Sequence, residues 1–451
     1  MQLHDGPLRP AAESLRSLEH LISRRVGLVR TLEQLSAAPL SPRVFLFAAE
    51  AALLGAKGQP FPRPNCGGAG LTPEQGKVAA LAEVVETYCS SSPKGELLFG
   101  TYEALCRSHE LIAPERFALF SERQYSTAGF PFQRFTRQTP LAWVRGHSLV
   151  QHREVLVPAS LVYLSHVPRK DEANIGPVTS TGLAAGASLE QAILSGLYEC
   201  LERDAFTIFW MNDLPARRVD IHNSAHEHEV RQIFDTHLSV PGYEYRVYDI
   251  TNDLGVPTAY VILRGHVNGH MLYAIGAAAR LDGSQAVLKA LIEAVQGLPY
   301  VAYLMAADPQ WQPVPDFSNV EDFTHSARLY SIASHLTPHL LSVEQRLSGT
   351  ATLEALPRWQ SPSQVAAINT LAERLGTRGY EAVAVDVTTN DVEALGMKVV
   401  RIVTPELQLL HGSHRFPFQG GPRVYQVPVL LGHRTEQAGE AQLSPYPHPF
   451  P

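Results

Sequence analysis

Long stretches of apolar residues at three- and four-residue spacing predict helices at four places in the chain. One stretch begins after Thr72, where Pro73 suits the first helical position because that position needs no N–H donor. Another begins after Ser188, a residue type that caps helices, and a third begins after Asp282-Gly283. Residues 15–35 show the same spacing and predict a helical lead-in.

Shorter runs rich in branched and aromatic residues predict strands between these helices. The run at 44–54 is followed by a loop rich in proline and glycine at 58–70, and residues 306–360 are polar and weakly periodic. The other predicted strands lie at 139–149, 154–164, 243–250, 257–265, 270–279, 381–389 and 398–405. Helices mixed with strands that are largely adjacent in the chain indicate an α+β or mixed α/β fold.

The first two long helices repeat one sequence pattern. Residues 70–86 align without a gap with residues 186–202, and the third helix shares the later part of the pattern. Each helix carries a polar pair at i and i+3 spacing: Glu83/Glu86, Glu199/Glu202 and Glu293/Gln296. Side chains at this spacing point to the same side of a helix, so each helix can present two oxygen ligands in one direction.

A site where these helices meet would gather several carboxylates around Arg203, which shares a helix face with Glu199. Such a cluster repels itself unless cations neutralise it. Mg²⁺ takes oxygen ligands and usually binds together with phosphates, so the pattern predicts a Mg–nucleotide pocket built from carboxylates. The alternative is that these glutamates lie on solvated helix faces. The apolar neighbours argue against it, because a buried carboxylate needs a partner or a metal.

Composition narrows the classes of function. The chain has 451 residues, of which 45% are hydrophobic, and this suffices for a large core. A formal net charge of −7 excludes the basic field of a nucleic-acid-binding protein. Four cysteines without metal-type spacing indicate reduced thiols and a cytoplasmic location. We expect neither secretion nor a membrane partner, because no signal peptide is visible and the apolar run at 44–56 is short.

A histidine group and one cysteine invite a metal or nucleophile interpretation that their spacing does not support. His222, His226 and His228 cannot share one face in a helix or in a strand, so we expect an exposed polar segment. Cys200 follows Glu199 directly and would face away from the carboxylates, so we expect it in the core.

The combined motifs resemble the YcaO family over roughly residues 60–451. Residues 180–210 resemble its Ser-x-Gly turn followed by a Glu-x-x-Glu-Arg helix. Residues 67–88 resemble its Glu-x-x-Glu helix, and residues 284–296 resemble its Glu-x-x-Gln helix. No piece is specific alone, but the combination is. It implies the YcaO fold, with internally repeated helix–strand units around a carboxylate-lined nucleotide site.

Carried over residue by residue, the resemblance implies a set of Mg²⁺ ligands and a set of ATP contacts. The implied metal ligands are Glu83, Glu86, Glu199, Glu202 and Glu293. The implied nucleotide contacts are Arg203, Gln296 and Gln191, and Gln191 stands where the family can carry an acidic metal ligand. Two other departures from the family pattern are Thr87 after Glu86 and the pair Pro405-Glu406.

The resemblance also divides the chain into three parts. A lead-in at 1–60 would pack on the core, a YcaO domain would span 61–440, and a Pro-rich arm at 441–451 would reach the active site. Residues 447–451 fit the PxPxP ending of azoline-forming members. Alternating prolines favour an extended, preorganised segment, so the carboxylate of Pro451 is a candidate base. A disordered tail is the alternative.

The activity implied by the resemblance is ATP-dependent cyclodehydration. Cys, Ser or Thr of a ribosomally made precursor peptide attacks the preceding amide carbon, and the oxyanion takes the γ-phosphate of ATP. Loss of phosphate then leaves a thiazoline or oxazoline. A leader-binding or E1-like partner protein would deliver the peptide, and an FMN dehydrogenase would be an optional further member of the complex.

Two alternative functions stay open at this point. Thioamide or macroamidine formation would use the same ATP site with another nucleophile, although the Pro-rich ending argues against it. A non-catalytic scaffold would keep the fold and dock other proteins, and loss of the metal ligands would favour it. Most of those ligands are present in this sequence.

Overall fold

The computed structural model describes residues 1–6, 9–36, 40–52, 65–91, 93–224, 228–267 and 269–451. Among these residues the strands form three sheets. The antiparallel three-stranded sheet has the order β1 (Val29–Gln34), β2 (Phe45–Ala51) and β3 (Asn65–Gly70). The five-stranded sheet has the order β11 (His270–Ala279), β10 (Thr258–Val267), β9 (Glu244–Asp249), β8 (Ala216–Asp220) and β12 (Leu347–Thr352).

The third sheet has six strands. Its order is β4 (Leu98–Gly100), β5 (Leu141–Ser148), β13 (Val383–Asp386), β14 (Lys398–Val403) and β7 (Leu183–Gly186), with β6 (Arg153–Pro158) paired to β5. The strands predicted from 139 to 164, from 243 to 279 and from 381 to 405 all occur. The mixed α/β class predicted from the sequence is confirmed.

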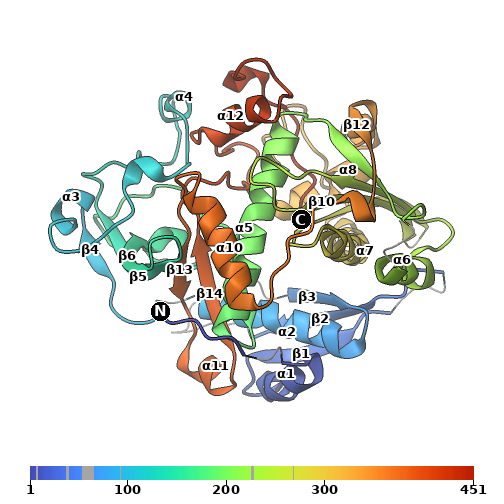
Figure 1. The fold of residues 1–451 in the computed structure, drawn as a ribbon, viewed down its shortest axis with the longest axis horizontal. Helices are drawn as coiled ribbons and strands as arrows, with labels where there is room; N and C mark the ends of the chain where they lie inside the picture. Colours follow the sequence, from blue (N-terminus) through green and yellow to red (C-terminus); the bar gives the residue numbers. More distant parts are fainter. Residues whose placement is uncertain (7–8, 37–39, 53–64, 92, 225–227, 268) are drawn as a thin grey trace.

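Each of the three predicted long helices directly follows a strand, and the three strands belong to three different sheets. They are α2 (Pro73–Cys89) after β3, α5 (Leu189–Met211) after β7 and α7 (Gly283–Ala307) after β11. Thr72, Ser188 and Asp282 accept backbone N–H groups at the respective helix starts, which confirms the cap predicted at Ser188. Figure 1 shows α5 passing through the middle of the molecule, between the six-stranded sheet and the five-stranded sheet.

The remaining helices surround these layers. They are α1 (Ala11–Leu18), α3 (Tyr102–Leu105), α4 (Glu122–Tyr125), α6 (His228–Ile233), α8 (Phe323–Ile332), α9 (Thr337–Leu340), α10 (Gln364–Gly376), α11 (Asn390–Ala394) and α12 (Arg423–Leu430). Helix α8 and strand β12 lie inside the weakly periodic region 306–360, where the sequence pattern indicated neither.

Helix α7 is the one described helix that is long and apolar enough to cross a membrane, judged by length and composition. It packs on β10 and β11, and its apolar residues join their core. A core helix passes the same test, so this composition is weak evidence for a membrane span.

Two sequence predictions near the N-terminus are wrong. The predicted helix over 15–35 ends early, because the chain turns at Gly27, whose N–H bonds to Ser23, and then pairs as β1 with β2. The predicted loop contains strand β3, and the part of that loop at 58–64 lies outside the described residues. Glycines permit this strand, since a Cβ on Gly68 would overlap the backbone of α2.

Candidate functional site

The two glutamates of α2 bind backbone groups of two different sheets. Glu83 accepts the N–H of Gly67 in β3 at 2.7 Å, and Glu86 accepts the N–H of Ala185 in β7 at 2.7 Å. Their i, i+3 spacing places both carboxylates on one side of the helix. Helix α2 therefore lies between these two strands and ties both to its carboxylate face.

Helix α5 presents its acidic pair beside Arg203. Glu199 accepts the N–H of Gly182 at 3.3 Å, just before β7, and lies 3.8 Å from the Arg203 guanidinium. Glu202 lies closer to the guanidinium, 3.2 Å from its Nε atom, but the orientation does not make a hydrogen bond. The Arg203 Nε–H therefore has a charge neighbour and no hydrogen-bond acceptor among the described residues.

The carboxylate of Glu202 is the buried acid at the centre of the predicted site. Burial is the largest cause that raises its pKa, to about 8, and the charges of Glu293 and Glu199 act in the same direction against the opposing effect of Arg203. Only 7% of Glu202 is exposed. Because Glu293 belongs to α7, this electrostatic coupling joins the acidic faces of α5 and α7.

Gln296 completes the contact between α7 and α2. A Cβ added to Gly67 would stand 3.1 Å from the Gln296 side-chain nitrogen, so this amide lies directly against the strand that binds Glu83. The predicted site residues of α2, α5 and α7 thus surround the ends of β3 and β7.

Gln191 lies at the start of α5. Its side-chain oxygen accepts the N–H of Ala187, and its own N–H bonds to the Ser188 hydroxyl. Gln75 does the same for Leu71 and Thr72 at the start of α2. Gln191 therefore takes part in the hydrogen bonds that close the start of α5, and its role as a nucleotide contact stays a prediction.

The carboxylate oxygens of the acidic residues are suitable ligands for a divalent cation. In the described part of the chain no three Asp, Glu, His or Cys side chains converge as a metal-binding group as they stand. Glu83, Glu86 and Glu199 instead accept backbone N–H groups. Glu202 shows that a cation suits this site. It is a buried carboxylate with like charges nearby, and an added cation would stabilise its ionised form. Oxygen ligands of this kind suit Mg²⁺.

The Pro-rich tail packs along α5 and α8. The Ser444 N–H bonds to the Met211 carbonyl at 2.7 Å, and the Trp210 indole N–H donates to Tyr446 at 3.0 Å. The Phe450 ring lies 3.8 Å from the Arg203 guanidinium carbon and is 1% exposed. The tail thus brings an aromatic face against the arginine of the predicted site.

His448 shapes this tail. Its Nε2–H donates to the His411 carbonyl at 2.6 Å, and its Nδ1 accepts the Phe450 N–H at 3.2 Å. Burial lowers the pKa of His448 to about 4, so the ring is neutral at physiological pH. Both ring nitrogens serve the local fold of the tail.

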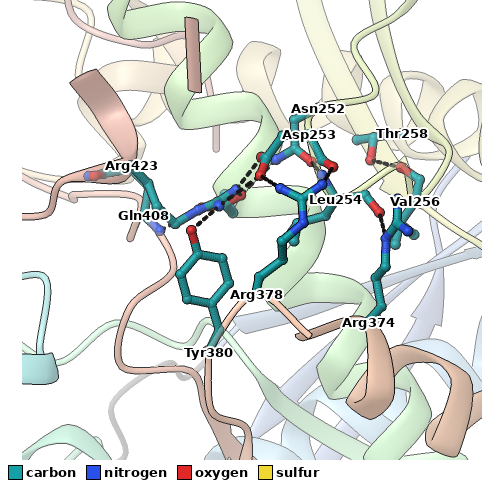
Figure 2. A network of polar contacts seen from close by, with 11 residues as sticks. Asn252, Asp253, Leu254, Val256, Thr258, Arg374, Arg378, Tyr380, Gln408 and Arg423 are labelled. Atoms are coloured by element: carbon teal, nitrogen blue, oxygen red, sulfur yellow. Dashed lines mark hydrogen bonds and ion pairs between the residues drawn. The ribbon is translucent and has the colours of Figure 1, made fainter. Parts of the chain in front are cut away.

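Sequence reasoning missed a buried charge network behind the site. Arg423 of α12 bonds to Asp204 of α5 at 2.6 Å, to Asp253 at 2.8 Å and to the Tyr380 hydroxyl at 3.0 Å. Figure 2 shows Arg378 bonded to the same Asp253. No local pattern could reveal these partners, because they are far apart in the sequence.

The isolated cysteine and histidine predictions have separate outcomes. Cys200 is buried, as predicted, and burial raises its pKa to about 12. His222 is exposed, whereas His226 lies outside the described residues.

A cavity of about 300 Å³ is lined by Phe209, Arg217 and Asp249 among others, and none of the predicted site residues lines it.

Comparison with known families is consistent with this geometry. The model of the YcaO cyclodehydratase family, described as binding ATP and Mg²⁺, matches residues 67–408. The chain belongs to the YcaO family. ATP and Mg²⁺ are the cofactors of this family, and the resemblance seen in the sequence is confirmed.

The chain is also similar to individual proteins. The chain is 25% identical over 346 residues to an uncharacterized protein of Methanothermobacter thermautotrophicus, covering 76% of this chain and 81% of that protein. A solved heterocyclase in complex with substrate and cofactor is 26% identical with a TM-score of 0.79, covering 100% of this chain. The chain spans 59% of that heterocyclase.

A second solved structure supports the fold. YcaO from Methanopyrus kandleri, bound with AMPPCP and Mg²⁺, has a TM-score of 0.62 at 22% identity and covers 89% of this chain and 92% of its own. Together, the family match and these structures identify an ATP-dependent enzyme of the cyclodehydratase type.

Proposed function

We propose that this YcaO protein converts Cys, Ser or Thr residues of a ribosomally made peptide into thiazolines or oxazolines. The observation that carries the proposal is the packing of the Pro-rich tail against Arg203, beside the buried Glu202. The similarity to a heterocyclase over the whole length of this chain supports it.

The acidic helices would hold the cofactors. Glu83, Glu86, Glu199, Glu202 and Glu293 would bind Mg²⁺. Arg203, Gln296 and Gln191 would bind ATP. When bound, Mg–ATP supplies the phosphoryl group that activates the amide oxygen.

The tail would prepare the site for the peptide. Phe450 holds the Arg203 guanidinium from one face, so this side chain loses little freedom when it binds an anion. Buried Phe450 also keeps water from that face. Pro451 follows directly, and its carboxylate is our candidate for accepting the amide proton.

The proposed function includes partner proteins. A leader-binding or E1-like protein would present the peptide, and an FMN dehydrogenase would oxidise azolines where azoles are the final product. We also retain the division at residues 60/61 and 440/441, with the arm at 441–451 as the part that reaches the site. The first of these boundaries falls between β2 and β3 of one sheet.

The test is mass spectrometry of a precursor peptide incubated with the protein, its partner and Mg–ATP. Loss of one water per modified residue, together with phosphate release, is the expected result. Glu202→Gln should abolish both, and removal of Pro451 should reduce the rate. Glu190→Gln is the matched control, because Glu190 is buried on the same helix but bonds to the backbone of His4.

Other outcomes would replace the proposal. An unmodified peptide without ATP turnover, despite a verified partner, would indicate a scaffold. A mass change that corresponds to sulfur in place of oxygen would indicate thioamide formation.

A further inference from the structure

Arg401 is a buried arginine with unsatisfied donors. It lies on β14 with 5% of its surface exposed, and its Nε and Nη1 atoms have no hydrogen-bond partner among the described residues. Burial lowers its pKa to about 10, so the guanidinium stays charged at neutral pH. A buried charge with unpaired donors is costly, which indicates a ligand that supplies the acceptors.

The side chain borders a small cavity of about 40 Å³. Three threonines, Thr179, Thr181 and Thr404, also line it, and most of the other lining residues are apolar. This volume is room for about three water-sized groups. The Cys200 thiol contributes no negative charge to the lining, because burial raises its pKa to about 12.

The cavity adjoins the predicted nucleotide site. Thr181 precedes Gly182, whose N–H binds Glu199 and whose carbonyl accepts the Ile402 N–H at 2.7 Å. The charge of Glu199 acts on Arg401 through space. One short turn therefore connects the cavity lining to a proposed Mg²⁺ ligand.

We propose that Arg401 and the three threonines form a pocket that binds the phosphate group produced at the neighbouring nucleotide site. Guanidinium and hydroxyl donors that surround a small volume match an oxyanion with several acceptor oxygens. This inference deepens the proposed function, because it rests on ATP cleavage as the source of the phosphate. The pocket would hold phosphate after transfer and so separate it from the Mg²⁺ ligands.

Inorganic phosphate is the probe for a direct test on the full chain. Thermal unfolding is followed in EDTA with rising sodium phosphate, against sodium chloride of equal ionic strength. We expect phosphate to raise the midpoint of the wild type by about 2 °C near saturation. Arg401→Met should lose this shift, and it should fold because it replaces an unpaired charge by an apolar chain of similar length.

Three further variants sharpen the test. Thr181→Val removes one hydroxyl at nearly constant volume and should weaken phosphate binding about tenfold, measured by equilibrium dialysis. Arg346→Met is the matched control, because Arg346 is also desolvated but pairs with Asp213 and does not line the cavity. Arg203→Met should keep the phosphate shift, which separates the pocket from the nucleotide contacts.

A shift that disappears in Arg203→Met and survives in Arg401→Met would overturn the proposal, and so would an equal shift with chloride. An Arg401-dependent shift with acetate but not with phosphate would reassign the pocket to a carboxylate. The assay needs neither peptide nor partner, so phosphate binding in a protein that forms no azoline would refute the proposed function alone.

Discussion

At the scale of single residues, the site depends on an acid that is held away from water. Glu202 has Arg203 as its cation neighbour, yet burial and two further carboxylates outweigh that neighbour and raise the pKa of Glu202. Glu83 and Glu86 accept backbone N–H groups. At Glu202 an added cation would favour the ionised carboxylate, because it would offset burial and the neighbouring negative charges.

The metal-free protein should lose stability as pH rises. The unfolded chain ionises Glu202 near the ordinary value of 4.5, whereas the folded protein keeps its proton until about pH 8. The favourable contribution is thus complete below pH 4.5 and is lost through pH 8, with a size on the order of a few kcal/mol. Thermal unfolding in EDTA from pH 5 to 8.5 measures it.

Glu202→Gln provides the comparison for this pH dependence. The amide cannot ionise, so the variant should show a flatter decline of unfolding midpoint with pH. Equal slopes in the two proteins would contradict the assignment of the raised pKa to Glu202.

At the scale of elements, the position of α5 is fixed on two sides. Glu202 and Arg203 face α7 and the tail, while the next residue, Asp204, is fully buried against Arg423 of α12. Helix geometry points consecutive side chains in different directions, so one short segment joins the site to the charge network of Figure 2.

Removing the arginine of this network should destabilise the protein strongly. Arg423→Met leaves Asp204 and Asp253 buried without their shared cation, at a cost of about 3–5 kcal/mol in the free energy of unfolding. Arg134→Met, which breaks an exposed pair with Glu122, should cost far less, because water screens that pair. Urea unfolding of both variants measures the difference, and similar costs would contradict a special role for the network.

Sequence patterns predicted elements well where the signal is local. Helices α2, α5 and α7 were predicted, and so was the Ser188 cap of α5, because periodicity and capping involve neighbouring residues. Strand β3 was missed because a glycine-rich segment is typical of a loop. Only the structure shows that its glycines allow close packing on α2. The hydrogen bonds of Gln191 to Ala187 and Ser188 at the start of α5 were not predicted, because glutamine can serve both as a ligand and at a helix start.

At the scale of the molecule, three sheets carry one site. Strands β3, β7 and β11 each lead into one of the acidic helices, and those strands belong to three different sheets. A ligand held by all three helices would therefore connect the three sheets. The sequence repeat predicted this convergence, but the contacts of Arg401 and Asp204 depend on chain segments far away and could not be predicted.

Nucleotide binding should consequently protect distant parts of the chain together. Amide hydrogen exchange, measured by mass spectrometry with and without Mg²⁺ and a non-hydrolysable ATP analogue, should slow in α2, α5 and α7. Helix α4 carries none of the proposed ligands and should exchange unchanged. Slowing confined to one of the three helices would contradict a shared site.

The buried pair of Asp204 and Arg423 has a consequence for synthesis on the ribosome. The two residues are 219 positions apart, and at usual rates of translation this distance corresponds to about 10 to 45 s. Throughout that interval the nascent α5 carries an acidic side chain whose buried partner does not yet exist. The growing chain must therefore keep this helix hydrated or shielded by chaperones until α12 emerges.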